Sequence, residues 1–135
     1  MIALDTNILL YSCDRADRSR QNKALTLIRD SAGGVLLWQV ACEFVAASRK
    51  LAAQGFAPPD AWGRLAEFLN LFALVLPSKR VLDHARELHL NSGWSFWDAM
   101  IVAACLDCGV TRFYTEDVPG RVAPAPLEII NPFTT

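Results

Sequence analysis

The sequence lacks three features that would each assign the protein to a broad class. It has no basic excess: 13 Lys and Arg stand against 14 Asp and Glu, and a net charge of −1 argues against binding nucleic acid through bulk positive charge. Its longest apolar run near residue 100, Ala99 to Leu106, is far short of the roughly 20 residues that span a bilayer, so we expect no membrane protein. The N-terminus shows no secretory signal, which favours a cytoplasmic location.

Several enzyme motifs are absent as well. The sequence has no Cys and His pairs spaced for zinc and no Gly-x-Ser-x-Gly element, and Gly33-Gly34 lacks the Lys-Ser/Thr of a phosphate-binding loop. Cys105 and Cys108 have the spacing of a redox pair, but they lie in the last turn of a predicted helix, where the dipole does not activate a thiol. A chain that is 53% hydrophobic needs no disulfides, so we interpret its four cysteines as reduced thiols.

Apolar periodicity and turn residues divide the chain into alternating short strands and helices. We predict strands at residues 2–4, 35–38, 73–76, 111–115 and 127–130. Predicted helices span 19–31, 39–53, 60–71, 78–90 and 95–108, with a mixed, charged segment between the first strand and the first helix. Strands that are apolar on both faces indicate a parallel sheet covered on both sides. The prediction is one α/β domain over residues 1–135, a three-layer α/β/α sandwich with a short central parallel sheet.

Two aspartates follow predicted strands. Asp5 comes directly after the first strand, and Asp117 lies two residues beyond Thr115, the end of the fourth. A lone Asp in such a place is more simply a turn residue. Because ligands of parallel sheets bind beyond the carboxyl ends of the strands, the pair is more suggestive of a site than either residue alone.

Glu43 lies beside the apolar stripe of its predicted helix, in the first turn. The stripe consists of Val40, Phe44, Ala47 and Leu51. An unpaired buried charge costs several kcal/mol, and no Lys or Arg lies within one turn. We therefore expect Glu43 to meet a cation, a metal or solvent in a cleft, and the alternative is a solvated Glu favoured by the helix dipole.

Asp98 fits two interpretations. With Ser95 it forms the Ser-x-x-acid pattern that begins a helix, and capping alone would explain it. Ile101, Val102 and Cys105 nevertheless lie on the same helix face, which should meet the sheet. Asp98 can therefore serve both as a capping residue and as a site residue.

The four acids Asp5, Glu43, Asp98 and Asp117 could converge at one edge of the sheet. Because like charges in one cleft repel, we expect a hard divalent cation, Mg²⁺ or Mn²⁺, among them. The rest of the chain then has 10 acidic against 13 basic residues, a net +3 that suits a phosphodiester substrate. Among the basic residues, we expect phosphate contacts from Arg15, Arg18, Arg20 and Lys23 and interpret the others as solvated.

The acids stand in a recognisable series of motifs. These are Leu4-Asp5-Thr6-Asn7, Glu43-Phe44, Trp97-Asp98-Ala99, Thr115-Glu116-Asp117 and the closing Ile129-Ile130-Asn131-Pro132-Phe133. In this order they resemble the PIN domain family, and more closely its stand-alone VapC-type ribonuclease toxins, over nearly the whole chain. One departure is the short Val118-Pro119-Gly120 stretch, where relatives often have a longer polar loop.

The resemblance implies a function and a set of roles. Asp5, Glu43, Asp98 and Asp117 would form a catalytic, metal-binding quartet, and Thr6, Asn7 and Thr115 would orient metal, water or phosphate. It also implies endonucleolytic RNA cleavage dependent on Mg²⁺ or Mn²⁺, a homodimer, and inhibition by a small antitoxin protein.

The mechanism that we expect uses a metal-activated water and leaves a 5′-phosphate and a 3′-hydroxyl. A histidine-driven route is disfavoured because His84 and His89 face roughly 140° apart on a helix. Two rival hypotheses stay open. A Mg²⁺-dependent phosphotransferase with Asp5 as nucleophile would need a second Asp at position 7, where the chain has Asn7. A non-catalytic binding module would have kept the fold without turnover.

Two predicted helices carry several large apolar side chains, which either all face the sheet or are in part exposed. These side chains are Phe44, Val45, Trp62, Leu65, Phe68 and Leu69. We expect some of them to form a partner surface, and the four tryptophans to be core or interface residues.

Overall fold

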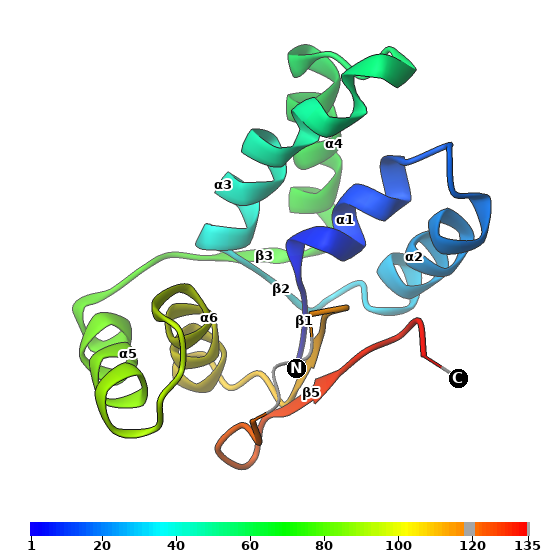
Figure 1. Cartoon of the computed structure of the whole chain (residues 1–135). Coiled ribbons are helices and arrows are strands. Elements are labelled where there is room, and N and C mark those ends of the chain that lie inside the picture. The colour runs from blue at the N-terminus through cyan, green and yellow to red at the C-terminus, as the bar shows by residue number, and fades with distance from the viewer. Residues whose placement is uncertain (118–120, 135) are drawn as a thin grey trace.

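A computed structural model describes residues 1–117 and 121–134 of the chain, and within them a five-stranded sheet is flanked by helices (Figure 1). The strands are β1 Ile2–Leu4, β2 Val35–Leu37, β3 Ala73–Val75, β4 Arg112–Tyr114 and β5 Glu128–Ile130. The helices are α1 Thr6–Cys13, α2 Arg18–Asp30, α3 Trp38–Ala47, the 3-10 helix η1 Ser48–Gln54, α4 Pro58–Leu71, α5 Lys79–Asn91 and α6 Phe96–Asp107. The predicted α/β class is confirmed.

The strand order places the first strand at the centre of the sheet. The order is β3-β2-β1-β4-β5, and every neighbouring pair is parallel. The chain therefore winds outward from β1 in one direction and then crosses over to β4 and β5 on the other side. Such a reversal opens a crevice at the carboxyl ends of the central strands, where ligands of open α/β sheets bind.

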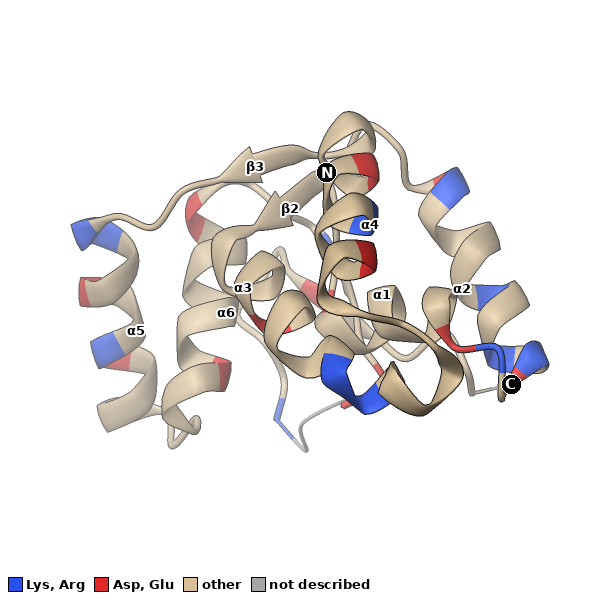
Figure 2. Cartoon of the chain, turned by 90° about the horizontal axis from the view of Figure 1, so that it is seen from above, with Lys and Arg blue, Asp and Glu red and all other residues tan. Residues whose placement is uncertain are grey.

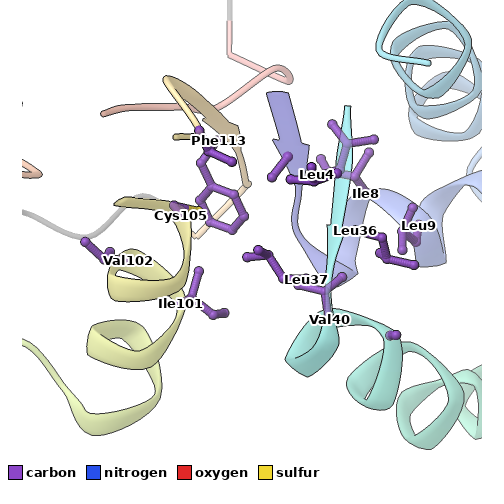
Figure 3. Close-up of a cluster of buried hydrophobic side chains, with 14 of the residues drawn as sticks. Leu4, Ile8, Leu9, Leu36, Leu37, Val40, Ile101, Val102, Cys105 and Phe113 are labelled. Atoms are coloured by element: carbon purple, nitrogen blue, oxygen red, sulfur yellow. The ribbon is translucent and has the colours of Figure 1, made fainter. Parts of the chain in front are cut away.

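Helices cover both faces of the sheet. Figures 1 and 2 show α1 and α2 on one side and α5 and α6 on the other, while α3, η1 and α4 rise from the carboxyl edge. Adjacent strand residues serve opposite faces, as the pleat requires. In Figure 3, Leu36 lies beside Leu9 of α1, whereas Leu37 lies toward Ile101 of α6. The hydrophobic core thus anchors the helices that frame the crevice.

Two local expectations were wrong. Residues 6–13, expected as a mixed segment, form helix α1, whose N-cap is Asp5 and whose Ile8, Leu9 and Ser12 are buried. The predicted helix over 39–53 is α3 followed by the tighter η1, which ends at Gly55 with a positive φ of 80°. The departure noted at Val118-Pro119-Gly120 lies outside the described residues. In the part of the chain that the structure describes, every helix is too short or too polar to cross a bilayer.

Gly34 directly precedes β2, at a point where the backbone of β1 comes very close. A Cβ at this position would overlap the carbonyl oxygen of Ile2 and lie 3.1 Å from that of Ser31. Because both atoms belong to the backbone, neither can move aside cheaply. We expect Gly34→Ala to lower the free energy of unfolding by about 1–3 kcal/mol in urea titrations.

Gly63→Ala is the matched control for this prediction. A Cβ on Gly63, in α4, would meet no atom within 4 Å. Removing a glycine from a helix interior should raise stability by about 0.5–1 kcal/mol. If the two substitutions change the free energy of unfolding in the same direction, the close approach of β1 to Gly34 is not as described.

Candidate active site

Asp5 joins the central strand to helix α1. Its backbone N–H donates a 2.9 Å hydrogen bond to the carbonyl of Tyr114 at the end of β4, so strand pairing fixes its position. Its carboxylate Oδ1 accepts a 2.7 Å bond from the backbone N–H of Thr6, which makes Asp5 the N-cap of α1. The carboxylate is therefore held at the carboxyl end of β1, in the predicted crevice.

Thr115 connects the acids of two strands. Its side chain is buried, and its hydroxyl donates a 2.7 Å hydrogen bond to Oδ2 of Asp5. The hydroxyl oxygen of Thr115 in turn accepts hydrogen bonds from the backbone N–H of Asp117 at 3.0 Å and from Nδ2 of Asn7 at 3.4 Å. One hydroxyl thus sets the orientation of Asp5 and the path of the backbone at Asp117.

Glu43 is half-buried and has two side-chain partners. Its Oε2 accepts a 3.0 Å bond from the hydroxyl of Thr6, and its Oε1 accepts a 2.8 Å bond from Nε2 of Gln39, one turn earlier. Glu43 was expected in the first turn of its helix, where the helix dipole favours a negative charge most. Because α3 begins at Trp38, Glu43 lies in the second turn instead. Gln39 was missed, although its i,i+4 spacing from Glu43 is a readable signal.

Asp98 occupies the expected place at the start of α6. The hydroxyl of Ser95 accepts a 3.4 Å hydrogen bond from its backbone N–H, so the capping interpretation is confirmed. Ile101, Val102 and Cys105 are buried against the core, as predicted, while Asp98 itself is exposed. The cap uses only the backbone N–H of Asp98, so its carboxylate is available to bind a ligand.

Two neighbouring pockets bring the four acids to one edge of the sheet. The larger, about 420 Å³ and here called the acidic pocket, is lined by Asp5, Glu43 and Asp117. The smaller, about 20 Å³, is lined by Asp5, Asp98 and Asp117. Asp5 and Asp117 belong to both pockets, so Glu43 and Asp98 stand on either side of a shared pair.

The electrostatics of Asp5 reflect this crowding. Burial raises the pKa of its carboxyl above the ordinary value of 3.8, hydrogen bonds from Thr115 and Thr6 oppose the rise, and the charges of Glu43 and Asp117 add to it. A negative charge at Asp5 is therefore costly without a cation nearby.

The donors fit a hard divalent cation in type. Carboxylate oxygens are the ligands of Mg²⁺, and the crowding of charge at Asp5 is what such an ion would relieve. Within residues 1–117 and 121–134, no three Asp, Glu, His or Cys side chains are close enough to enclose an ion as they stand. Waters and phosphate oxygens would complete the shell of a bound ion, as they commonly do for Mg²⁺ in proteins.

A second network holds Glu116, the residue between Thr115 and Asp117. Glu116 accepts hydrogen bonds from the Tyr11 hydroxyl and, at 2.7 Å, from the guanidinium of Arg20. That guanidinium lies 5.3 Å from the ring centroid of Tyr11 and 5.7 Å from that of Phe133. The closing motif of the chain thereby packs against the segment that carries Asp117.

The network has a spectroscopic consequence at Tyr11. Burial and the hydrogen bond to Glu116 raise its pKa from 10.0 to about 12. Because the folded pKa exceeds the unfolded one, this stabilisation is complete below pH 10 and is lost as the pH rises toward 12. In a near-ultraviolet absorbance titration, Tyr11→Phe should remove the phenol ionisation of the native protein near pH 12, and equal titrations would contradict the network.

The basic residues expected to contact phosphate lie elsewhere. Arg20 is engaged by Glu116 and Asp17, and Arg15 donates to the carbonyl of Gln54 at 2.7 Å. Arg15, Arg18, Arg20 and Lys23 do not line the two pockets of the acids. Arg49 and Lys50, interpreted from sequence as solvated, line the acidic pocket instead.

The expected apolar surface is present only in part. Of the six side chains considered, Trp62 is 61% and Leu69 is 41% exposed, whereas Phe44, Leu65 and Phe68 are buried. A second apolar surface surrounds a pocket of about 470 Å³, here called the apolar pocket. It is lined by 13 residues that include Trp38, Glu43, Leu76, Pro77, Trp97 and Met100.

The remaining candidates take no part in the pockets of the acids. His84 and His89 lie on α5, and Nδ1 of His89 is 2.8 Å from the carbonyl of Trp94. All four cysteines are free, and burial raises the pKa of the Cys105 thiol, which makes it unreactive.

Comparisons with known proteins bear on the family and on the fold. The family model described as "PIN domain" matches residues 2–118. Among solved structures, a chain of a toxin-antitoxin complex from Klebsiella pneumoniae superposes with a TM-score of 0.72 at 15% identity, over 100% of both chains. A search of curated proteins finds no match. The match of the family model over residues 2–118, with which the fold agrees, establishes that the chain belongs to the PIN domain family.

Proposed function

We propose that this protein is a divalent-metal-dependent endoribonuclease and the toxin of a toxin–antitoxin pair. PIN domains are generally nucleases, and the Klebsiella chain of the same fold comes from a toxin-antitoxin complex. The observation that carries the proposal is the pair of pockets in which Asp5 and Asp117 are shared between Glu43 and Asp98. This acidic edge suits metal-assisted attack on a phosphodiester.

In this proposal the four acids hold Mg²⁺ or Mn²⁺. When bound, the ion supplies a water of lowered pKa and stabilises charge on the phosphate. The hydroxyls of Thr6 and Thr115 keep Glu43 and Asp5 oriented, which limits reorganisation during the reaction. The water oxygen bonds to phosphorus, the bond from phosphorus to the 3′ oxygen breaks, and that oxygen leaves with a proton, giving a 5′-phosphate and a 3′-hydroxyl.

The partners in this proposal are a second copy of the chain and a small antitoxin protein. The antitoxin would occupy the apolar pocket, where Trp38, Leu76 and Trp97 are 46%, 63% and 63% exposed. Glu43 lines both this pocket and the acidic pocket, so a protein seated there would cover the active site. An RNA substrate and four free cysteines favour a cytoplasmic location.

The test is incubation of the purified protein with total cellular RNA, with Mg²⁺, Mn²⁺ or EDTA, beside Asp98→Asn. We expect discrete cuts that need metal and vanish in the variant. Asp98→Asn is informative because the capping bond uses its backbone N–H, so the helix should still form. Cyclic-phosphate ends that persist in EDTA would contradict the mechanism.

The same experiment addresses the two rival functions. If RNA survives every metal while the circular dichroism spectrum is native, catalysis on RNA is excluded. Binding of RNA without cleavage would then support a non-catalytic module. Transfer of phosphate to Asp5 from acetyl phosphate would support the phosphotransferase, although Asn7 bonds to Thr115 and offers no second carboxylate.

A further inference from the structure

The acidic pocket continues into a groove between α1 and η1. Its neighbour is a pocket of about 280 Å³, and both are lined by Asn7, Leu10 and Lys50. The second pocket reaches Asp14 and Gln54 at its far end. These shared walls form one continuous groove, here called the α1–η1 groove, that begins at the acids and leads away from them.

Two cations stand where the groove leaves the acids. Arg49 and Lys50 line the acidic pocket, both are exposed, and neither forms an ion pair within residues 1–117 and 121–134. In Figure 2 the turn that continues α3 carries this positive charge. Asp14, the acid farther along, already accepts hydrogen bonds from Gln54 at 2.7 Å and from the Ala16 N–H at 2.9 Å. The groove therefore offers unengaged positive charge beside a cluster of acids.

The groove includes some apolar surface between these polar ends. Leu10 and the ring of Tyr11 line it, beside Leu51, which is only 6% exposed. A wall of this kind accepts the face of a base, while cations along its rim bind the backbone, and only an unpaired strand can present both at once. A duplex would keep its bases stacked inside.

We propose that single-stranded RNA lies in the α1–η1 groove next to the scissile bond, with Arg49 and Lys50 binding its phosphates and Leu10 and the ring of Tyr11 contacting a base. This assignment rests on the proposed function and names where its substrate binds. The acids repel a polyanion, and the chain as a whole, with a net charge of −1, does not attract one. Arg49 and Lys50 offset this repulsion locally, beside the acids.

Fluorescence anisotropy with a labelled single-stranded RNA of mixed sequence tests the groove in EDTA, where no cleavage competes. Arg49→Gln combined with Lys50→Gln should weaken binding about tenfold and lower the slope of log Kd against log salt by about 1.4, for two phosphate contacts. Both side chains are exposed, so the melting temperature should not change. The matched control, Lys79→Gln with Arg86→Gln on α5, removes the same charge from a surface outside the pockets and should bind as the wild type does.

The outcomes separate this inference from the proposed function. If the wild type cuts RNA but the groove variant binds and cuts equally well, the groove assignment is wrong and the nuclease stands. The assignment is also wrong if Arg18→Gln with Lys23→Gln, on α2, takes away the binding instead. If the groove variant loses binding while the wild type never cuts, the groove stands and the nuclease falls.

Discussion

Asp5→Asn should reduce RNA cleavage severely and, without divalent metal, make the protein more stable. The amide oxygen of asparagine can keep the capping bond from the Thr6 N–H, while its NH2 group takes the place of the oxygen that accepts from Thr115. Because the cap of α1 remains, we expect the fold to be retained. It removes a carboxylate whose pKa is raised by burial and by the charges of Glu43 and Asp117. We expect cleavage to fall by about a thousandfold and the melting temperature in EDTA to rise by a few degrees.

Thermal denaturation with and without Mg²⁺ completes this prediction. The wild type should gain stability on adding Mg²⁺, because an ion that binds only the folded state shifts unfolding by mass action. Asp5→Asn should lose that gain. Asp30→Asn is the control, since Asp30 is 63% exposed on α2 and should change neither activity nor the response to Mg²⁺. A variant at position 5 that still cuts RNA would refute the assignment of Asp5.

Thr115→Val should be the most damaging change outside the acids. Valine has nearly the same shape, but it removes the donor to Asp5 and the acceptor of the Asp117 N–H in a site that is 2% exposed. We expect a loss of about 1–3 kcal/mol in the free energy of unfolding, from buried groups left unpaired. Cleavage should fall about a hundredfold, because two acids lose their fixed geometry.

Thr115→Ser is the matched control. Serine keeps the hydroxyl and loses only a methyl group, so it should retain most of the activity, measured as the rate of cleavage at saturating Mg²⁺. Comparable rates for the valine and serine variants would show that the hydroxyl has no role in orienting Asp5 and Asp117.

The sequence predicts the sheet and the places of the acids because both depend on local patterns. Short apolar segments between helices lead to a parallel sheet, and polar residues after strands such as Leu4 then fall at its carboxyl edge. The place of Asp98 at a helix start was readable from its local motif with Ser95, and it was considered a site residue because Ile101, Val102 and Cys105 lie on the same helix face. Glu43 was found because a carboxylate beside an apolar stripe needs an explanation.

What the sequence did not reveal depends on tertiary contacts or on ambiguous residues. Helix α1 was missed because Asp5 was taken only as the end of a strand, although the same residue caps the helix that follows. The hydrogen bond from Arg20 to Glu116 joins residues 96 positions apart along the chain, and no local pattern predicts it. Arg49 looks like any solvated cation until η1 turns it toward the acidic pocket.

The exposed tryptophans show the same limit. Composition indicates that some large apolar side chains must be left over, and Trp62 was named for that reason. Trp38 and Trp97 belong to separate helices, α3 and α6, and only the tertiary fold makes them line one pocket. An apolar surface shared by two helices is therefore visible in the fold and not in either sequence segment.

The account depends on four acids acting as one metal centre, and calorimetric titration with Mn²⁺ tests this most directly. The wild type should bind Mn²⁺, and each of Asp5→Asn, Glu43→Gln, Asp98→Asn and Asp117→Asn should weaken binding, while Asp30→Asn should not. If the Glu43 or Asp98 variant binds Mn²⁺ as tightly as the wild type, the two pockets do not form one metal centre. If the wild type binds no Mn²⁺, with or without RNA, the account as a whole is contradicted.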